Sequence, residues 1–353
     1  VNTLHPPLYY HLLHLLSEPA DPGAAQFAAL RDSSAWLAML AVLALTVLGL
    51  RADMSLLAHF TYLSVLGSLP MLGYLGGAVN NDTLAILAGA LFALGLTDIL
   101  KDTADERAWL ILLLGGLLAF VAKLTAAMLV LFSALAALGW LLRSGTPLHL
   151  GRRRLLLGAL FIAPVLYYQA YLWLEYQSLL PPDLGSKDPQ GYAKSDFARY
   201  GASAARLDLA GWFGRFIQYI REGWFGIHAH RSFFKDSLLQ LAPLIALHGF
   251  ALVALLQTPA ARNRAFHVAG KCTLLALLLV LGIQFYKSYQ GHLAAGTLGG
   301  LQPRYVLPFA CAFAMLAAVF VDRLRQGPLV FTAVVALCLG ALYYDFPYFL
   351  RYY

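Results

Sequence analysis

Long apolar runs, broken by short polar segments, make up most of this chain. Several runs approach the roughly 20 residues that a helix needs to cross about 30 Å of hydrocarbon. They lack the two-residue alternation of membrane-barrel strands, and a helix satisfies its backbone N–H and C=O groups within its own segment. The pattern predicts an all-α membrane protein, a polytopic helical bundle of about ten spans. The predicted spans are Trp36–Leu50, Leu56–Leu72, Thr83–Leu96, Ala108–Ala122, Leu124–Leu142, Leu155–Trp173, Leu238–Leu256, Cys272–Phe285, Tyr305–Val321 and Leu329–Tyr343.

The apolar stretch 108–142 is too long for one span, because a straight helix of that length would overshoot the hydrocarbon. We expect a turn at Lys123, with an antiparallel span on either side. A charge left at the bilayer centre costs roughly 2.5–3.5 kcal/mol, so Lys123 needs a partner. The alternative is that its side chain extends from a helix end to the interface.

Positive charge alternates between the two sides of this predicted bundle. Every second connection is basic, whereas the loop Gly73–Asn81 carries neither Lys nor Arg. The positive-inside rule places the basic connections in the cytoplasm and both Val1 and Tyr353 outside. Because no signal-peptide pattern precedes the first run, we expect a further span and a first outer loop upstream of Val1. The basic connections carry Arg51; Lys101 and Arg107; Arg143 and Arg152–Arg154; Arg262, Arg264 and Lys271; and Arg323 and Arg325.

Composition agrees with a membrane protein. Hydrophobic residues make up 60% of the chain and charged residues 12%, against roughly 25% charged in a soluble domain. The net charge of +7 is spread over loops, which favours helix-flanking positive charge over nucleic-acid binding. Cys272, Cys311 and Cys338 lie inside apolar runs and show neither metal-site spacing nor a disulfide framework.

The predicted outer side holds two larger segments within what we treat as one domain, 1–353. The segment Asn2–Ser34 contains an amphipathic stretch, His5–Leu16. The other segment, residues 177–236, is a large outer loop, and a loop of this length is uncommon unless it has a function. Within it, residues 211–226 interleave Trp and Tyr with Arg, which predicts a helix lying in the headgroup layer.

Polar and ionisable groups also gather on the predicted outer side. Asp82 is the candidate catalytic residue, because a carboxylate can act as a base, as a metal ligand or as an acceptor for a hydroxyl. Cations can hold a phosphate, Arg as a bidentate fork and Lys as a point charge. A membrane-embedded substrate with a phosphate head, such as a polyprenyl-phosphate sugar, fits this set. The candidate substrate-binding residues are His5, Tyr10, Asn81, Lys123, Lys287, Gln302 and Arg304.

These residues also have structural interpretations. Asp82 follows Asn81 at the start of an apolar run, which is equally typical of a helix cap. Arg304 precedes a span and could be an ordinary interfacial anchor. The Trp and Tyr residues of 211–225 could form an aromatic belt rather than a platform for a sugar.

Four short motifs occur in order, with gaps the size of spans, over nearly the whole chain, and all fall on the predicted outer side. Together they resemble the GT-C superfamily of membrane glycosyltransferases, and within it the bacterial branches related to protein O-mannosyltransferases and to the aminoarabinose transferase of lipid A. The motifs are His5-Pro-Pro-Leu-Tyr-Tyr10, Asn81-Asp82-Thr-Leu-Ala85, Ala122-Lys-Leu-Thr-Ala126 and Gln302-Pro-Arg-Tyr-Val-Leu-Pro308.

The resemblance implies a polyprenyl-phosphate sugar donor, a lipid, glycan or protein acceptor, and transfer at the periplasmic face of a bacterial inner membrane. Such enzymes keep their principal acidic residue on the first outer loop, which would lie upstream of Val1. Asp82 matches the second acidic position, and His5 matches a position that is Lys in the aminoarabinose relatives and faces the donor phosphate. The stretch Gln302-Pro-Arg304 departs from the commoner Gln-Gly-Arg, which retains the guanidinium but changes the local backbone.

The sequence thus predicts a glycosyltransferase and leaves two alternatives open. One is a polysaccharide ligase or polymerase that uses a polyprenyl-linked glycan, and the other is a flippase or transporter of lipid-linked sugars. Transporters usually place ionisable groups near the bilayer midplane, often in repeated halves, and this chain shows no internal repeat. No nucleic-acid partner is expected. No cofactor is certain, and a divalent metal is possible although no residues form a convincing ligand set.

Overall fold

The computed structural model describes residues 9, 15, 24–76, 78–149, 151–177, 206–225, 227–229, 232–233, 238–295, 303–324 and 327–352. The described chain is mostly α-helical, with a short antiparallel pairing of β1 with β2. The elements are α2 (Ala24–Leu50), α3 (Leu56–Gly67), α4 (Pro70–Gly76), α5 (Asp82–Lys101), α6 (Glu106–Ala122), α7 (Leu124–Arg143), α8 (Arg152–Tyr176), α12 (Leu209–Phe225), β1 (Ile227–Ala229), β2 (Ser232–Phe233), α13 (Leu238–Leu256), α14 (Arg264–Ala295), the 3-10 turns η1 (Pro303–Tyr305) and η2 (Leu307–Phe309), α15 (Cys311–Arg323) and α16 (Pro328–Tyr352).

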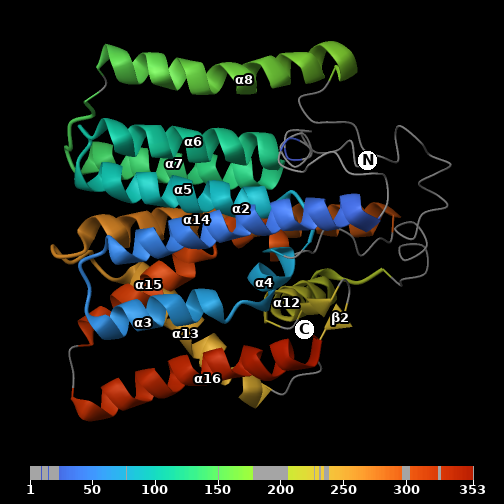
Figure 1. Ribbon diagram of the computed structural model, residues 1–353, viewed down its shortest axis with the longest axis vertical. Helices are drawn as coiled ribbons and strands as arrows, with labels where there is room; N and C mark the ends of the chain where they lie inside the picture. The colour runs from blue at the N-terminus through green and yellow to red at the C-terminus, as the bar shows by residue number, and fades with distance from the viewer. Residues whose placement is uncertain are drawn as a thin grey trace.

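The long helices lie side by side with their axes roughly along one direction (Figure 1). Helix α5 is the centre of the packing, since 83% of its most apolar part is buried, against 6% for the peripheral α8. Two glycines let α5 and α6 approach closely. A Cβ added at Gly95 would lie 2.4 Å from the backbone nitrogen of Leu112, and one at Gly115 would lie 2.4 Å from that of Phe92. Small residues have this role in helix packing within membranes.

The prediction of about ten spans is confirmed only in part. Among the described residues, five helices are long and apolar enough to cross a membrane: α2, α5, α7, α8 and α14. The helices α3 and α4 are bent by 59° at their junction and would make a sixth span if taken together.

The remaining predicted spans are helical but short, for identifiable reasons. Pro70 begins α4 after a break in the helix, because proline lacks the N–H that a continuing helix needs. The predicted span Tyr305–Val321 opens instead with two 3-10 turns, which leaves α15 with 13 residues. Helix α6 has 17 residues, and the described apolar parts of α13 and α16 are of similar length or shorter.

The break at Lys123 is confirmed. Helix α6 ends at Ala122 and α7 begins at Leu124, with Lys123 extended between them at φ −165° and ψ 136°. The two helices then pack against each other side by side (Figure 1).

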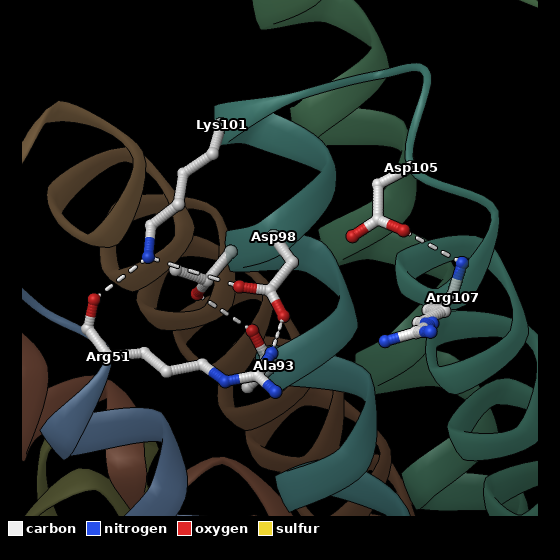
Figure 2. A network of polar contacts seen from close by, with 7 residues as sticks. Arg51, Ala93, Asp98, Lys101, Asp105 and Arg107 are labelled. Carbon is white, nitrogen blue, oxygen red and sulfur yellow. Dashed lines mark hydrogen bonds and ion pairs between the residues drawn. The ribbon is translucent and has the colours of Figure 1, made fainter.

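The basic connections meet at one end of the bundle, as the charge pattern predicts. Figure 2 shows Arg51, at the end of α2, paired with Asp98 of α5. The Lys101 ammonium donates a hydrogen bond to the Arg51 carbonyl at 2.8 Å and lies 3.9 Å from Asp98 Oδ1. Beyond this network, Arg262 Nη2 donates to Asp53 Oδ1 at 2.9 Å and thereby lowers the pKa of that carboxyl.

Further hydrogen bonds join the other connections at the same end. Thr103 Oγ1 donates to the Pro147 carbonyl at 2.9 Å, and Arg323 donates to the Thr258 carbonyl. The basic connections therefore share one side. That this side faces the cytoplasm stays a prediction from the positive-inside rule.

Candidate functional site

Three charged residues from three separate segments meet at the opposite end of the bundle. Asp82 is the first residue of α5, Lys123 lies between α6 and α7, and Arg304 lies in η1. The Lys123 ammonium forms an ion pair with Asp82 Oδ1, and Arg304 Nε lies 3.5 Å from Asp82 Oδ2. We call these three residues the Asp82 cluster. The structure thus brings together the candidate carboxylate and two of the predicted phosphate-binding cations.

The cluster is buried on the side of Lys123 and open on the side of Arg304. The side chain of Asp82 is 2% exposed and that of Lys123 is 4% exposed, whereas that of Arg304 is 27% exposed. Lys123 therefore does not extend to a surface, and its buried charge has the partner that the sequence required. A buried cation and carboxylate depend on each other, because losing one partner leaves the other charged and desolvated.

The side chain of Asp82 does not cap α5. The N-cap residue is Asn81, with helical φ and ψ of −63° and −12° and no side-chain cap hydrogen bond. Asn81 Nδ2 instead donates to the Ala122 carbonyl at 3.0 Å. This bond ties the start of α5 to the end of α6 and places Lys123, the next residue, beside Asp82. Asn81 is thus a positioning residue in this structure, and its contact with substrate stays a prediction.

The segment that carries Arg304 is held against α5 by a close backbone approach. A Cβ added at Gly89 would lie 2.0 Å from the carbonyl oxygen of Pro308. The rings of Phe92 and Phe309 stack beside this point, with centroids 5.9 Å apart. Gly89 follows Asp82 by about two helical turns and so lies on the same side of α5. The glycine therefore lets the 3-10 turns lie along α5 with Arg304 near the start of the helix.

We expect Gly89→Ala to destabilise the protein, because the added methyl meets a backbone carbonyl that cannot rotate away. Overpacking of this kind costs on the order of 1–3 kcal/mol. The measurement is the midpoint of thermal unfolding in detergent. Gly139→Ala in α7 is the matched control, since a Cβ there meets nothing within 4 Å. Equal midpoints for both variants would contradict the close approach.

The ring of Tyr305 lies beside both cations of the Asp82 cluster, and Tyr305 was not among the predicted site residues. The Lys123 ammonium lies 4.2 Å from the centroid of the Tyr305 ring, and the Arg304 guanidinium carbon lies 5.8 Å from it. Both distances are within the range of cation–π attraction. The signal for Tyr305 was its position directly after Arg304 in the fourth motif.

A chain of hydroxyl groups lies beside the start of α5. Tyr9 donates to Ser34 Oγ at 3.2 Å, and Ser34 Oγ donates to the Ala78 carbonyl at 2.7 Å and lies 3.3 Å from Thr83 Oγ1. Thr83 follows Asp82 directly, so this chain connects the first motif to the second. Tyr10 was the candidate predicted from the first motif, and the structure shows its neighbour Tyr9 linked through Ser34 to Thr83, the residue after Asp82.

Asp82 Oδ2 and Arg304 Nε face each other as an ion pair at 3.5 Å, and within the described chain neither atom forms a hydrogen bond. Two cations against one carboxylate leave one positive charge in excess. The cluster can therefore accept an anionic group, with the partly exposed guanidinium of Arg304 as the group that such an anion would reach first.

The other candidates lie apart from the cluster or outside the described residues. Lys287 is exposed on α14, where it borders an open apolar groove of about 500 Å³, and in the described chain it forms no ion pair with the cluster. His5, Tyr10 and Gln302 lie outside the described residues.

A divalent metal does not fit this site as described. Metal ions such as Mg²⁺ and Ca²⁺ prefer several oxygen ligands, and the cluster offers one carboxylate that is already paired with two cations. The described residues contain no group of three or more His, Cys, Asp or Glu side chains that could hold a metal ion.

Comparisons with protein-family models, with curated proteins and with solved structures find no match to this chain.

Proposed function

We propose that this protein is a membrane glycosyltransferase of the GT-C type. It moves a sugar from a polyprenyl-phosphate donor to an acceptor hydroxyl at the non-cytoplasmic face of its membrane. The observation that carries the proposal is the excess positive charge of the Asp82 cluster, built from three of the four motifs at one end of a bundle of apolar helices. A lipid that carries a phosphate in the headgroup layer would meet this end of the bundle.

In the proposed reaction the acceptor oxygen forms a bond to the anomeric carbon of the sugar. The bond between that carbon and the phosphate oxygen breaks, and its electron pair leaves with the polyprenyl phosphate. Arg304 and Lys123 stabilise the negative charge that develops on this leaving group, which is the effect expected of preorganised cations at a reacting centre. The proton of the acceptor goes to a carboxylate base, a role that GT-C enzymes give to the acidic residue of their first outer loop.

Asp82 acts in this proposal through its charge. Its two oxygens face Lys123 and Arg304, so it fixes both cations at one place before the donor arrives. Preorganisation of this kind lowers the barrier, because the charged groups need not reorient during the reaction.

The position of the cluster also favours a transferase over a transporter. Transporters typically hold substrates near the bilayer midplane, at helices that are interrupted there. The Asp82 cluster lies instead at the ends of its helices, at the first residue of α5 and in the turn before α7.

The test is a transfer assay with the protein in nanodiscs and a panel of polyprenyl-phosphate monosaccharides, read as release of polyprenyl phosphate. We expect turnover with a monosaccharide donor. Turnover with polyprenyl-pyrophosphate glycans alone would identify a ligase or polymerase. Movement of an intact fluorescent lipid-linked sugar across a vesicle membrane, without cleavage, would identify a flippase.

A further inference from the structure

Helix α12 lies across the end of the bundle that carries the Asp82 cluster, next to α4 (Figure 1). Two buried tryptophans of α12 hold the helix in this position through contacts with α13 and α14. The Trp212 ring stacks on the His292 ring of α14, with centroids 4.4 Å apart, and Trp224 Nε1 donates to His248 Nε2 of α13 at 3.0 Å. A helix is thus confirmed within the predicted segment 211–226, and it is firmly attached to two helices of the bundle, whereas its place in the headgroup layer stays a prediction.

The same helix contacts η1 at a position where a side chain has no room. Gly223 is buried, and a Cβ added to it would lie 2.6 Å from Cγ and 2.7 Å from Cδ of Pro303. Carbon atoms in contact lie about 3.5–4.0 Å apart, so a methyl group at Gly223 would displace the proline by roughly 1 Å. The proline ring cannot turn away as a flexible side chain would, because its Cδ is bonded to the backbone nitrogen.

A displacement of Pro303 would reach the Asp82 cluster directly. Arg304 is the next residue in the same 3-10 turn, and its Nε lies 3.5 Å from Asp82. The other end of this segment cannot move to accommodate the displacement, since Pro308 is in backbone contact with Gly89. The segment is therefore held by α12 at Pro303 and by α5 at Pro308, with the guanidinium between the two contacts.

We propose that Gly223 is a positioning residue for the donor phosphate: through its contact with Pro303, helix α12 sets the place at which Arg304 meets that phosphate. The inference rests on the proposed function, because it takes the phosphate of a polyprenyl-phosphate lipid as the ligand of Arg304. It also gives the large outer loop a role, since the loop contributes the helix that fixes the site.

The arrangement explains why this chain tolerates proline in the fourth motif. A proline ring at position 303 needs space on the facing helix, and the missing side chain of Gly223 supplies that space. If the contact between Gly223 and Pro303 determines the position of Arg304, removing the proline ring should compensate for adding a methyl group at Gly223.

The experiment compares Gly223→Ala, the double variant Gly223→Ala/Pro303→Gly and the control Gly214→Ala. A Cβ at Gly214, also in α12, meets nothing within 4 Å, so this control shares the gain in helix propensity without the clash. The readouts are the dissociation constant for polyprenyl phosphate in nanodiscs, the KM values for donor and acceptor, and the midpoint of thermal unfolding.

We expect Gly223→Ala to weaken polyprenyl-phosphate binding by roughly tenfold or more, because a misplacement of about 1 Å is costly at a reacting site. The acceptor KM should stay unchanged, since a merely structural defect would affect both substrates. Gly214→Ala should bind like the wild type, and the double variant should recover part of the lost affinity, because the clash is gone although the proline ring is also missing. Wild-type affinity in a folded Gly223→Ala protein, or no recovery in a folded double variant, would overturn the inference.

A second variant covers the case in which Gly223→Ala does not fold. Pro303→Ala removes the ring atoms that face Gly223 without adding a clash, and it should weaken polyprenyl-phosphate binding by roughly threefold or more through the loosened position of Arg304. Unchanged affinity in that variant would also count against the inference. If the wild-type protein itself does not bind polyprenyl phosphate, the proposed function fails and this inference fails with it. If the wild type binds and the variants bind equally well, only the role of α12 is wrong.

Discussion

Arg304→Ala should lower sugar transfer by roughly a hundredfold or more, which corresponds to about 2.7 kcal/mol in the barrier. The reason is that Arg304 is the partly exposed cation of the Asp82 cluster, so under the proposed function it is the group that the donor phosphate reaches first. The loss should appear in kcat as well as in donor KM, because the negative charge on the phosphate grows as the sugar leaves. The measurement is steady-state transfer from a polyprenyl-phosphate donor in nanodiscs.

Arg304→Lys should restore part of the activity but not all of it, because an ammonium keeps the charge and loses the bidentate fork. The matched control is Arg262→Ala. Arg262 also pairs with a carboxylate, Asp53, but at the opposite end of the bundle. That variant should retain transfer within about a factor of two, since exposed surface ion pairs contribute little. Wild-type turnover in Arg304→Ala would remove Arg304 from the site.

The sequence predicted the gathering of charged residues at one end more reliably than the membrane spans themselves. Alternation of basic connections assigns each loop to one side, and this alone places Asp82, Lys123 and Arg304 at the same end of the bundle. The same reasoning required a partner for Lys123, which the structure supplies in Asp82. Predictions about charged residues hold because the free-energy cost of placing an unpaired charge in an apolar environment is large. It exceeds the free-energy differences that decide between local backbone conformations.

The number of spans was harder to predict, because hydrophobic runs do not show where a helix breaks. The run Leu56–Leu72 is continuous in composition, yet the chain bends by 59° before Pro70. The predicted span at Tyr305–Val321 likewise begins with 3-10 turns around Pro308. A proline lies at both positions in the sequence. Whether the helix bends or begins with a 3-10 turn there depends on the segments that pack against it.

The contacts that fix the site were not predictable from any pattern along the chain. Gly89 and Gly223 matter because a backbone or a proline ring from a distant segment occupies the place of their missing side chains. A glycine inside a helix has no sequence signal that separates such a position from Gly139, where the space is open. The interpretation of Asp82 as a helix cap was wrong for a related reason: the distant Lys123 and Arg304 determine where its carboxylate points.

Asp82→Asn should reduce both stability and transfer, which separates an ion-paired site residue from a helix cap. If Asp82 only capped α5, Asn would serve about as well and the substitution would be nearly harmless. In the structure the carboxylate neutralises Lys123, whose side chain is 4% exposed, so the variant leaves a buried cation without its partner. Breaking a buried pair in this way costs about 3–5 kcal/mol. The measurement is thermal unfolding and transfer on the same preparation.

The double variant Asp82→Asn/Lys123→Met then separates the structural role of the pair from its chemical role. Removing both charges leaves no unpaired charge in the core, so the double variant avoids the large cost of a buried cation that has lost its carboxylate. We therefore expect the unfolding midpoint to recover most of the way towards the wild type. Transfer should stay roughly tenfold or more below wild type, about 1.4 kcal/mol in the barrier, because the site has lost one cation and the anion that positions Arg304. A double variant that regains both stability and wild-type turnover would show that the pair only holds α5 to the turn before α7. The donor phosphate would then have to be bound by Arg304 without the help of either residue.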